Sequence, residues 1–377
     1  MKKVKLKDLG QIITGNTPKT SDDLNYISND ICFVKPSDIK DGTITYLADS
    51  EFYISEYARS KARILPPKSI LVTCIGIIGK IAINNIECSF NQQINAIIPS
   101  DNCLTEYLAY ALQSKQMEMQ DIANAPVVPI LNKTQFSEIE IYLPSLEEQK
   151  AIAERLDKVS GLIEKRKTQL EKLNLLIKSR FIEMFNDPKY NTSNLVKIGE
   201  IGALTSGGTP SRAKPEYFEG DIRWYSAGEL NALYLPDSVE HISEMALQQS
   251  SAKLFNKGTL MIGMYDTAAF KMGILTKDSS SNQACANLNP KQGYNIVWLY
   301  YLFDIMKPIF LQERQGVRQK NLSLSKIKEF EVPFAPFELQ EQFATFVEQI
   351  DKSKFQIQKS LEKLEILKKS LMQQYFG

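Results

Sequence analysis

The sequence predicts an α+β protein in which two homologous globular domains are joined by two long helices that pair as an antiparallel coiled coil. Three observations support this. The 377-residue chain repeats itself at an interval of about 191 residues, the first part of each repeat mixes short apolar runs with turn residues, and the second part carries a heptad pattern. Two copies are too few for a solenoid, so they indicate two modules in one chain.

The repeat can be followed from one end of the unit to the other. Residues 5–10 return as residues 197–202, and Thr-Gly-Asn-Thr-Pro at 14–18 returns as Ser-Gly-Gly-Thr-Pro at 206–210. Residues 169–179 return as residues 360–370. The whole chain is therefore one duplicated unit with a pseudo-two-fold relation between its halves.

The first part of each repeat reads as a mixed module of about 140 residues. Apolar runs at 31–34 and 222–225 each meet small or turn-forming residues, and runs at 69–73 and 259–262 each lead to a glycine. Helical stretches follow at 107–112 and 298–303. These signals predict a small sheet structure with a helix against it.

The second part of each repeat is a single long helix, because apolar residues fall at alternating spacings of four and three. Arg166 and Arg180 interrupt the first stripe, and Lys354 and Lys368 interrupt the second at other heptad positions. We expect the stripes to pair with each other, although an amphipathic helix could also lie on its own domain. The predicted seam consists of Ile152, Leu156, Val159, Ile163, Leu170, Leu173 and Ile177 in one helix, and Phe343, Val347, Ile350, Ile357, Leu361, Leu364 and Leu371 in the other.

These patterns set the expected domain limits. They are a first globular domain at 1–143, a first helix at 144–186, a linker at 187–194, a second globular domain at 195–334 and a second helix at 335–377. An antiparallel pairing of helices of about 40 residues, each rising roughly 60 Å, would place the two domains at opposite ends.

Composition is that of a soluble globular protein, with 43% hydrophobic and 24% charged residues. The first residues carry no apolar stretch of a signal peptide and no run is long enough to span a bilayer, so we expect a cytoplasmic protein. The net charge is +1, with 14 basic against 16 acidic residues at 1–143 and 15 against 14 at 195–334. Charge alone therefore does not indicate a nucleic-acid partner. A domain with balanced numbers of acidic and basic residues can still have a basic face on its surface.

The motifs argue against catalysis and against a metal or cofactor bound by this chain. His241 is the only histidine, and the five cysteines form no Cys-x-x-Cys pair. The glycine-rich segments at 76–80 and 207–210 lack the spacing of a phosphate-binding P-loop. The chain is therefore expected to be noncatalytic.

Taken in order, these motifs resemble those of one family, the specificity subunits of type I restriction-modification enzymes. The resemblance covers the whole chain. It rests on the two Gly-x-Thr-Pro loops, Gly-Asp-Ile-Arg-Trp at 220–224, the Ile-Gly-Lys segment ending at Lys80, and the helix openings at 144–149 and 336–342. The first copy departs from the pattern, with Asn29 in place of Gly220 and Phe33 in place of Trp224.

The resemblance implies that the globular domains are target recognition domains, each reading one half of a split, asymmetric site in double-stranded DNA. It implies that the helices set the spacing and bind methyltransferase subunits, two of them in our expectation, and that restriction subunits join the complex. S-adenosylmethionine, ATP and magnesium would belong to those partners. This chain would be the noncatalytic subunit that directs them.

Residues shared by the two copies should hold phosphates or the fold, whereas residues that differ should read bases. Tight turns without a ligand, buried amides that satisfy backbone groups and a solvated basic loop are the alternatives. The shared candidates are Thr17, Thr209, Ser211, Arg212, Lys80 and Lys271. The candidate base readers are Lys35, Ser37, Thr73, Gln92, Gln93, Tyr225, Ser226, Tyr265, Asp266, Thr267 and Gln283, together with Arg314, Arg318 and Lys320 in the basic segment 312–321.

Two other functions remain open from the sequence. A coiled-coil adaptor that joins two proteins without touching DNA fits the near-zero charge. A cryptic enzyme is disfavoured by the single histidine and the missing motifs.

Arg318 gives the sharpest prediction from sequence. Arg318→Ala should weaken binding to the cognate duplex far more than binding to scrambled DNA, because a base contact adds sequence-dependent affinity. Competition binding with the two duplexes measures this. Equal losses would reduce Arg318 to a phosphate contact.

Overall fold

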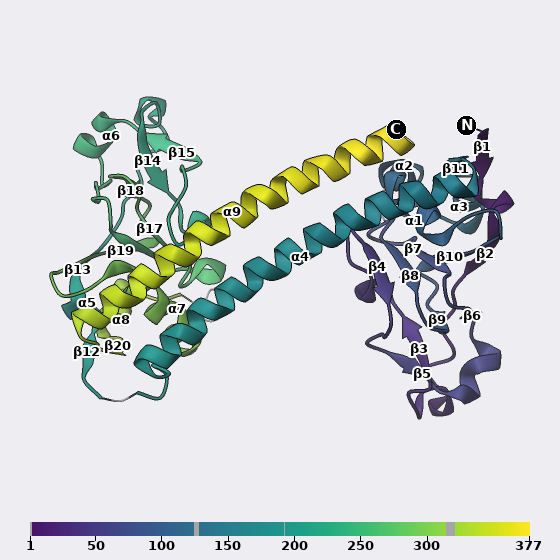
Figure 1. Ribbon diagram of the computed structural model, residues 1–377. Helices are drawn as coiled ribbons and strands as arrows, with labels where there is room; N and C mark the ends of the chain where they lie inside the picture. Colours follow the sequence, from purple (N-terminus) through teal and green to yellow (C-terminus); the bar gives the residue numbers. More distant parts are fainter. Residues whose placement is uncertain (1, 124–127, 192, 314–320) are drawn as a thin grey trace. The chain divides into compact units, whose positions relative to one another are not determined.

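The computed structural model describes residues 2–123, 128–191, 193–313 and 321–377 (Figure 1). Contacts divide the chain into two compact units, one of residues 1–167 with 359–377 and one of residues 168–358. Each unit contains a globular module, part of one long helix and part of the other. This confirms the predicted α+β class with two repeats. The division by contacts runs through both helices, whereas the predicted limits follow the change from module to helix along the chain.

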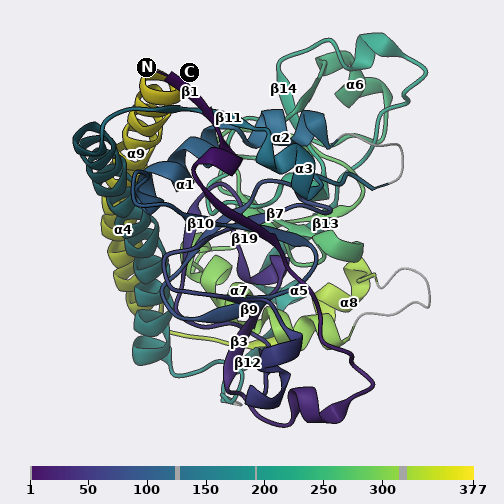
Figure 2. The same cartoon turned by 90° about the vertical axis from the view of Figure 1, so that its right-hand side faces the viewer.

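In the first unit, the described strands form three sheets (Figure 2). A small antiparallel pair joins β1 (Lys2–Lys5) to β11 (Glu140–Leu143). The central sheet has the order β2 (Gly10–Thr14), β10 (Ile94–Pro99), β7 (Ile70–Thr73), β8 (Ile81–Asn84) and β4 (Ile44–Leu47). The third sheet has the order β5 (Tyr53–Ile54), β3 (Ile31–Val34), β9 (Cys88–Phe90) and β6 (Ile64–Leu65).

Helix α1 (Thr105–Ser114) packs on β8 and β4 and supplies the core of this unit. Tyr107, Leu108 and Leu112 are fully buried against Ile70 and Val72 of the central sheet. Two shorter helices, α2 (Gln116–Ile122) and α3 (Lys133–Ser137), complete the module. The helix packs an apolar face on this sheet, in which β7 and β8 are fully buried, as hydrophobic burial requires.

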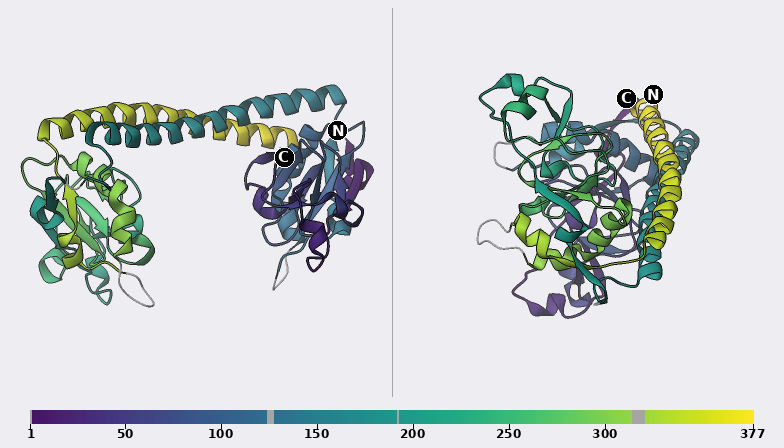
Figure 3. Two further views of the ribbon diagram at one scale, coloured as in Figure 1. Left: turned by 90° about the horizontal axis from the view of Figure 1, so that it is seen from below. Right: turned by 90° about the vertical axis from the view of Figure 1, so that its left-hand side faces the viewer.

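The second unit repeats this plan with small changes (Figure 3). Its strands form an antiparallel pair of β12 (Leu195–Lys197) and β20 (Glu331–Pro333), a sheet of β13 (Gly202–Ser206), β19 (Cys285–Pro290), β16 (Leu260–Gly263) and β17 (Met272–Ile274), and a sheet of β15 (Glu240–Ile242), β14 (Ile222–Tyr225) and β18 (Ser280–Ser281). Where the first unit has strand β4, the second has an isolated bridge between Tyr234 and Ile274.

Helix α7 (Ile296–Gln312) takes the place of α1 and packs on β17. Its Trp298, Leu302 and Phe303 are buried in one core with Phe181 and Phe343 of the long helices. The shorter helices of this unit are α5 (Ile198–Ile201), α6 (Glu244–Gln249) and α8 (Leu324–Glu329).

The two long helices are α4 (Leu146–Phe185) and α9 (Phe337–Phe376), each of 40 residues. In the first unit the start of α4 lies beside the end of α9, and Arg155 Nη1 donates to the Tyr375 hydroxyl at 2.9 Å. In the second unit the end of α4 lies beside the start of α9, with the rings of Phe181 and Phe343 5.2 Å apart. Within each unit the segments therefore run antiparallel. The predicted seam positions in both helices are buried or partly buried. No helix in the described part of the chain is long and apolar enough to cross a membrane.

A buried glutamine attaches each long helix to the module that precedes it. Gln149 Oε1 accepts from the Leu104 amide at 2.8 Å, and Gln149 Nε2 donates to the carbonyls of Asn102 at 3.1 Å and Pro144 at 3.0 Å. Gln149 has no exposed surface. One side chain therefore joins the start of α4 to the turn before α1.

Gln340 repeats this arrangement in the second unit. Its Oε1 accepts from the Asn295 amide at 2.8 Å, and its Nε2 donates to Gly293 at 3.3 Å and Ala335 at 2.7 Å. Each partner stands 191 positions after its counterpart in the first unit. A buried amide whose donors and acceptor are all used contributes rigidity without a desolvation penalty.

Replacing Gln340 with leucine should destabilise the second unit. Gln340→Leu leaves one amide and two carbonyls without a partner in a buried place, which should lower the free energy of unfolding by about 3 kcal/mol. Gln342→Leu, at an exposed position on the same helix, is the matched control. Denaturant unfolding compares the two variants, and similar midpoints would contradict this role.

Candidate nucleic-acid interface

The clearest feature shared by the two modules is a threonine–glutamine hydrogen bond on the surface. Thr17 Oγ1 donates to Gln92 Oε1 at 2.6 Å, and Thr209 Oγ1 donates to Gln283 Oε1 in the same way. Each threonine comes from a Gly-x-Thr-Pro loop and each glutamine from the turn before β10 or β19. Both glutamines are exposed. The bond orients an amide that still has surface open to a ligand.

Glycine is required where these loops meet. A Cβ on Gly15 would lie 2.1 Å from the Asn91 carbonyl oxygen, and one on Gly207 would lie 2.2 Å from the Ser281 carbonyl oxygen. The Gly15 amide donates to Ile94 O at 3.0 Å, and the Gly207 amide donates to Cys285 O at 3.1 Å. Close backbone approach therefore fixes the Gly-x-Thr-Pro loop against the glutamine turn.

The glutamine turn is shaped by an asparagine in both copies. Asn91 Oδ1 accepts from the Gln93 amide at 3.1 Å, and Asn282 Oδ1 accepts from the Ala284 amide at 3.0 Å. Such side-chain bonds to the backbone two residues on are typical of turns. Gln93 itself is held by Asn91, whose Nδ2 donates to Gln93 Oε1 at 3.0 Å.

In the second copy, Trp224 ties its strand to the Gly-x-Thr-Pro loop. The Trp224 indole Nε1 donates to the Gly208 carbonyl at 3.1 Å. Beside it, Arg212 lies over the ring of Phe218, with 4.5 Å to the ring centroid, and donates two hydrogen bonds to Glu240 at 2.5 and 2.8 Å. These bonds lower the pKa of Glu240. Arg212 is thus a partly exposed, well-oriented guanidinium next to the loop.

The first copy holds the same loop by another side chain. Asn16 stands where the second copy has Gly208, and its Nδ2 donates to Lys61 O at 2.8 Å while its Oδ1 accepts from the Arg63 amide at 2.8 Å. The Phe33 side chain has no N–H group with which to replace the Trp224 indole. The sequence did not identify Asn16, because its partners are backbone groups far along the chain.

Two candidate lysines lie next to strands, since Lys35 follows β3 and Lys80 precedes β8. Lys35 Nζ is 3.0 Å from the centroid of the Phe52 ring, and Lys80 Nζ donates to Pro36 O at 3.2 Å. Ser37 is exposed in the 3-10 turn Pro36–Asp38. Asp38 accepts from the Lys35 amide at 2.7 Å, and Glu229 accepts in the same way from the Ser226 amide at 2.7 Å.

Two predicted base readers are buried. Thr73 has no exposed surface and donates its hydroxyl to Ile77 O at 2.5 Å, and Tyr225, 1% exposed, donates to Pro236 O at 2.5 Å. Ser226 is only partly buried, but its hydroxyl donates to Glu229 at 2.7 Å. In this structure the Thr73 and Tyr225 hydroxyls support loops. A direct base contact by either residue does not fit its burial.

The structure describes only some of the remaining candidate DNA-binding residues. Ser211, Tyr265 and Thr267 are exposed, and Lys271 is partly buried. The backbone of Asp266 is described but its side chain is not. Arg314, Arg318 and Lys320 lie outside the described residues.

The described residues contain no group of histidine, cysteine and carboxylate side chains arranged to hold a metal ion. His241 Nε2 lies 3.2 Å from Asp237 Oδ1, and that carboxylate also pairs with Arg223 at 2.6 Å. All five cysteines are buried, and burial raises the pKa of Cys74 to about 11.

Each of the two α+β modules contains the same loop network and is followed by a long helix. The chain is therefore a duplicated, modular protein. The family model of the type I restriction modification DNA specificity domain matches residues 1–175 and again residues 190–368. The chain therefore belongs to this family.

Named relatives agree with this membership. The chain is 31% identical over 278 residues to the type I restriction enzyme MjaIX specificity subunit of Methanocaldococcus jannaschii, a match that spans 68% of this chain and 64% of the relative. It is 36% identical over 146 residues to the HindI specificity subunit of Haemophilus influenzae, spanning 38% and 31%. The matched regions thus span less than two thirds of these relatives.

Solved structures show the same fold. The S subunit of a type I restriction-modification system from M. genitalium superposes with a TM-score of 0.61 at 16% identity, covering 100% of this chain and 96% of that one. A structure from work on complex assembly and conformational transition of the type I R-M system gives a TM-score of 0.58, also at 16% identity, covering 99% and 97%.

The Trp224 hydrogen bond can be tested with an internal control. Trp224→Phe should cost about 1 kcal/mol more in the free energy of unfolding than Trp298→Phe. Both tryptophans are buried, but Trp298 Nε1 has no hydrogen-bond partner among the described residues, so only Trp224→Phe loses a bond. Thermal or denaturant unfolding of both variants measures the difference. Equal losses would mean that the indole contributes packing alone.

Proposed function

We propose that this chain is the noncatalytic DNA specificity subunit of a type I restriction-modification complex. In this role each globular module reads one half of a bipartite, asymmetric site in double-stranded DNA. The observation that carries the proposal is the double match to the DNA specificity domain within one chain. Two modules with different exposed loops suit two different half-sites.

The exposed glutamines are the best placed base readers in the proposal. A glutamine amide can donate and accept at once, which suits the N6 and N7 positions of adenine in the major groove. Gln92 and Gln283 are both exposed and both held by a threonine. Such a bond reduces the rotamer entropy that is lost when a side chain contacts a base.

Other candidates take supporting roles. Arg212, Ser211, Lys35 and Ser37 lie on the module surface near these loops or at strand ends, where phosphate contacts can position the duplex. Thr17 and Thr209 orient the glutamines. The sequence-based assignments of Tyr265, Thr267, Lys271, Arg314, Arg318 and Lys320 stay predictions.

The rest of the complex follows from the proposed role. Methyltransferase subunits, two in our proposal, would bind the long helices, and restriction subunits would complete the assembly. S-adenosylmethionine, ATP and magnesium would be bound by those partners and not by this chain. The expected location is the cytoplasm.

A coiled-coil adaptor that never touches DNA is the second candidate, favoured by the net charge of +1. Neighbouring reading frames for a methyltransferase and a helicase-nuclease would favour the specificity subunit. Salt-dependent binding to duplex DNA by the chain without its partners would exclude the adaptor.

The glutamine pair yields a test in which each variant controls for the other. Gln92→Leu should relax one half of the selected site and Gln283→Leu the other half, with a loss of about tenfold or more for the cognate base pair. The measurement is sequencing of duplexes that the assembled complex selects from a random library. Unchanged selection in both variants would remove the glutamines from base reading.

A further inference from the structure

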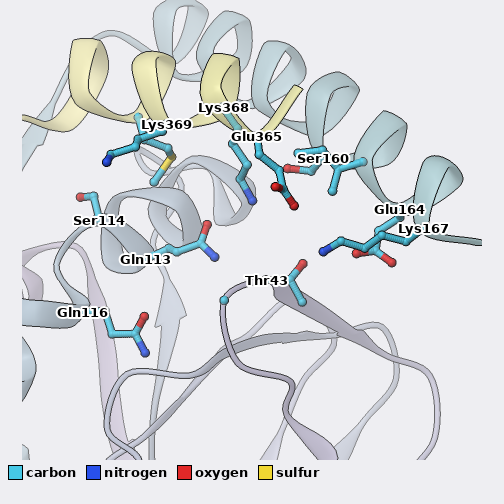
Figure 4. A pocket seen from close by; sticks show the side chains of 13 residues that line it. Thr43, Gln113, Ser114, Gln116, Ser160, Glu164, Lys167, Glu365, Lys368 and Lys369 are labelled. Atoms are coloured by element: carbon cyan, nitrogen blue, oxygen red, sulfur yellow. The ribbon is translucent and has the colours of Figure 1, made fainter. Parts of the chain in front are cut away.

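A hollow of about 390 Å³ lies in the first unit, where the module meets the two long helices (Figure 4). The helices contribute Lys167 of α4 and Lys368 and Lys369 of α9, and the module contributes Thr43 and Gln113. Figure 4 shows Lys368, Lys167 and Gln113 directed into this space. Its size falls within the range of small-molecule sites.

Lys368 is the charge set deepest in this hollow. It is partly buried, with its ammonium 5.9 Å from the centroid of the Tyr110 ring, and it forms no ion pair with any described residue. Burial, and after it the nearby Lys167, lower the pKa of Lys368, and Glu164 and Asp157 offset part of this effect. A partly desolvated ammonium that no described carboxylate contacts directly is costly, and a bound anion would offset that cost.

One further polar atom in the hollow has no partner, an amide oxygen that could accept a hydrogen bond from a hydroxyl or N–H group of a ligand. Gln113 Oε1 is buried and accepts no hydrogen bond from any described residue. Lys167 and Lys369 are exposed, as are the glutamates Glu164 and Glu365, and Asp157 also acts electrostatically on Lys368. Among the charged side chains that line the hollow, only Lys368 is partly buried.

The second unit shows that the scaffold does not require this hollow. Ile177 stands 191 positions before Lys368 and has no exposed surface. Phe181 stands 191 positions before Met372 and is also buried. The counterparts of Lys369 and Gln113 are Lys178 and Asp304, which form a salt bridge of 2.8 Å. In the second unit, apolar side chains fill the space that corresponds to the hollow, and its lysine is paired with an aspartate. In the first unit the corresponding space is open and lined by charged side chains.

We propose that this hollow of the first unit is a binding site for a small organic anion, whose phosphate or carboxylate group pairs with Lys368 and is flanked by Lys167 and Lys369. Ile163 and Met372 would contact the apolar part of the ligand. The site is independent of DNA reading, since neither the Gly-x-Thr-Pro loops nor the glutamine turns line it.

The test uses the full chain with inorganic phosphate and, separately, acetate as probes at constant ionic strength in chloride. Lys368→Ile installs the residue type that the second unit carries at this position, so the fold should tolerate it. Lys363→Ile, at an exposed position on the same helix, is the matched control with the same loss of charge. Thermal unfolding and titration calorimetry report binding, because a ligand of the native state raises the midpoint of unfolding.

The wild type and Lys363→Ile should be stabilised by at least one probe, and Lys368→Ile should bind it about tenfold or more weakly. A stronger response to phosphate points to a phosphate ester, and a stronger response to acetate points to a carboxylate. Lys368→Arg keeps the charge and should retain binding if Lys368→Ile folds poorly. Equal stabilisation of all variants, or none in the wild type, would overturn the site.

Discussion

The buried glutamine at the start of each long helix is the interaction on which the arrangement within each unit depends. Gln149 and Gln340 each use one acceptor and two donors on backbone groups of the preceding module. Because these bonds set where the helix leaves the module, they also set which helix face meets the core. The aromatic packing of Phe181 against Phe343 in the second unit follows from that placement.

Apart from this attachment, some interactions are the same in the two copies and others differ. The threonine–glutamine bond and the close approach at Gly15 and Gly207 are the same in both. The tether of the Gly-x-Thr-Pro loop differs, with Asn16 in one copy and Trp224 in the other. A framework that stays constant while neighbouring side chains change is the physical condition for two modules that present different surfaces on one scaffold.

Local pattern predicted the elements of this fold well, because heptad spacing and repeated strand signals are properties of short segments. It could not assign Asn16 or Gln149, whose partners are backbone groups brought together only by folding. Thr73 and Tyr225 were predicted to contact bases because the two copies differ there, but tertiary packing buries both side chains. Lys368 was read as an interruption of the helix seam, and only the module beside it reveals the hollow that it faces.

The central claim is that the two modules read two different parts of one DNA site. The most direct measurement is to co-express the chain with the methyltransferase subunit proposed as its partner and map methylated adenines across a genome. The account predicts one motif made of two unlike specified parts separated by unspecified bases. A palindromic or continuous motif, or no motif in an active complex, would contradict it.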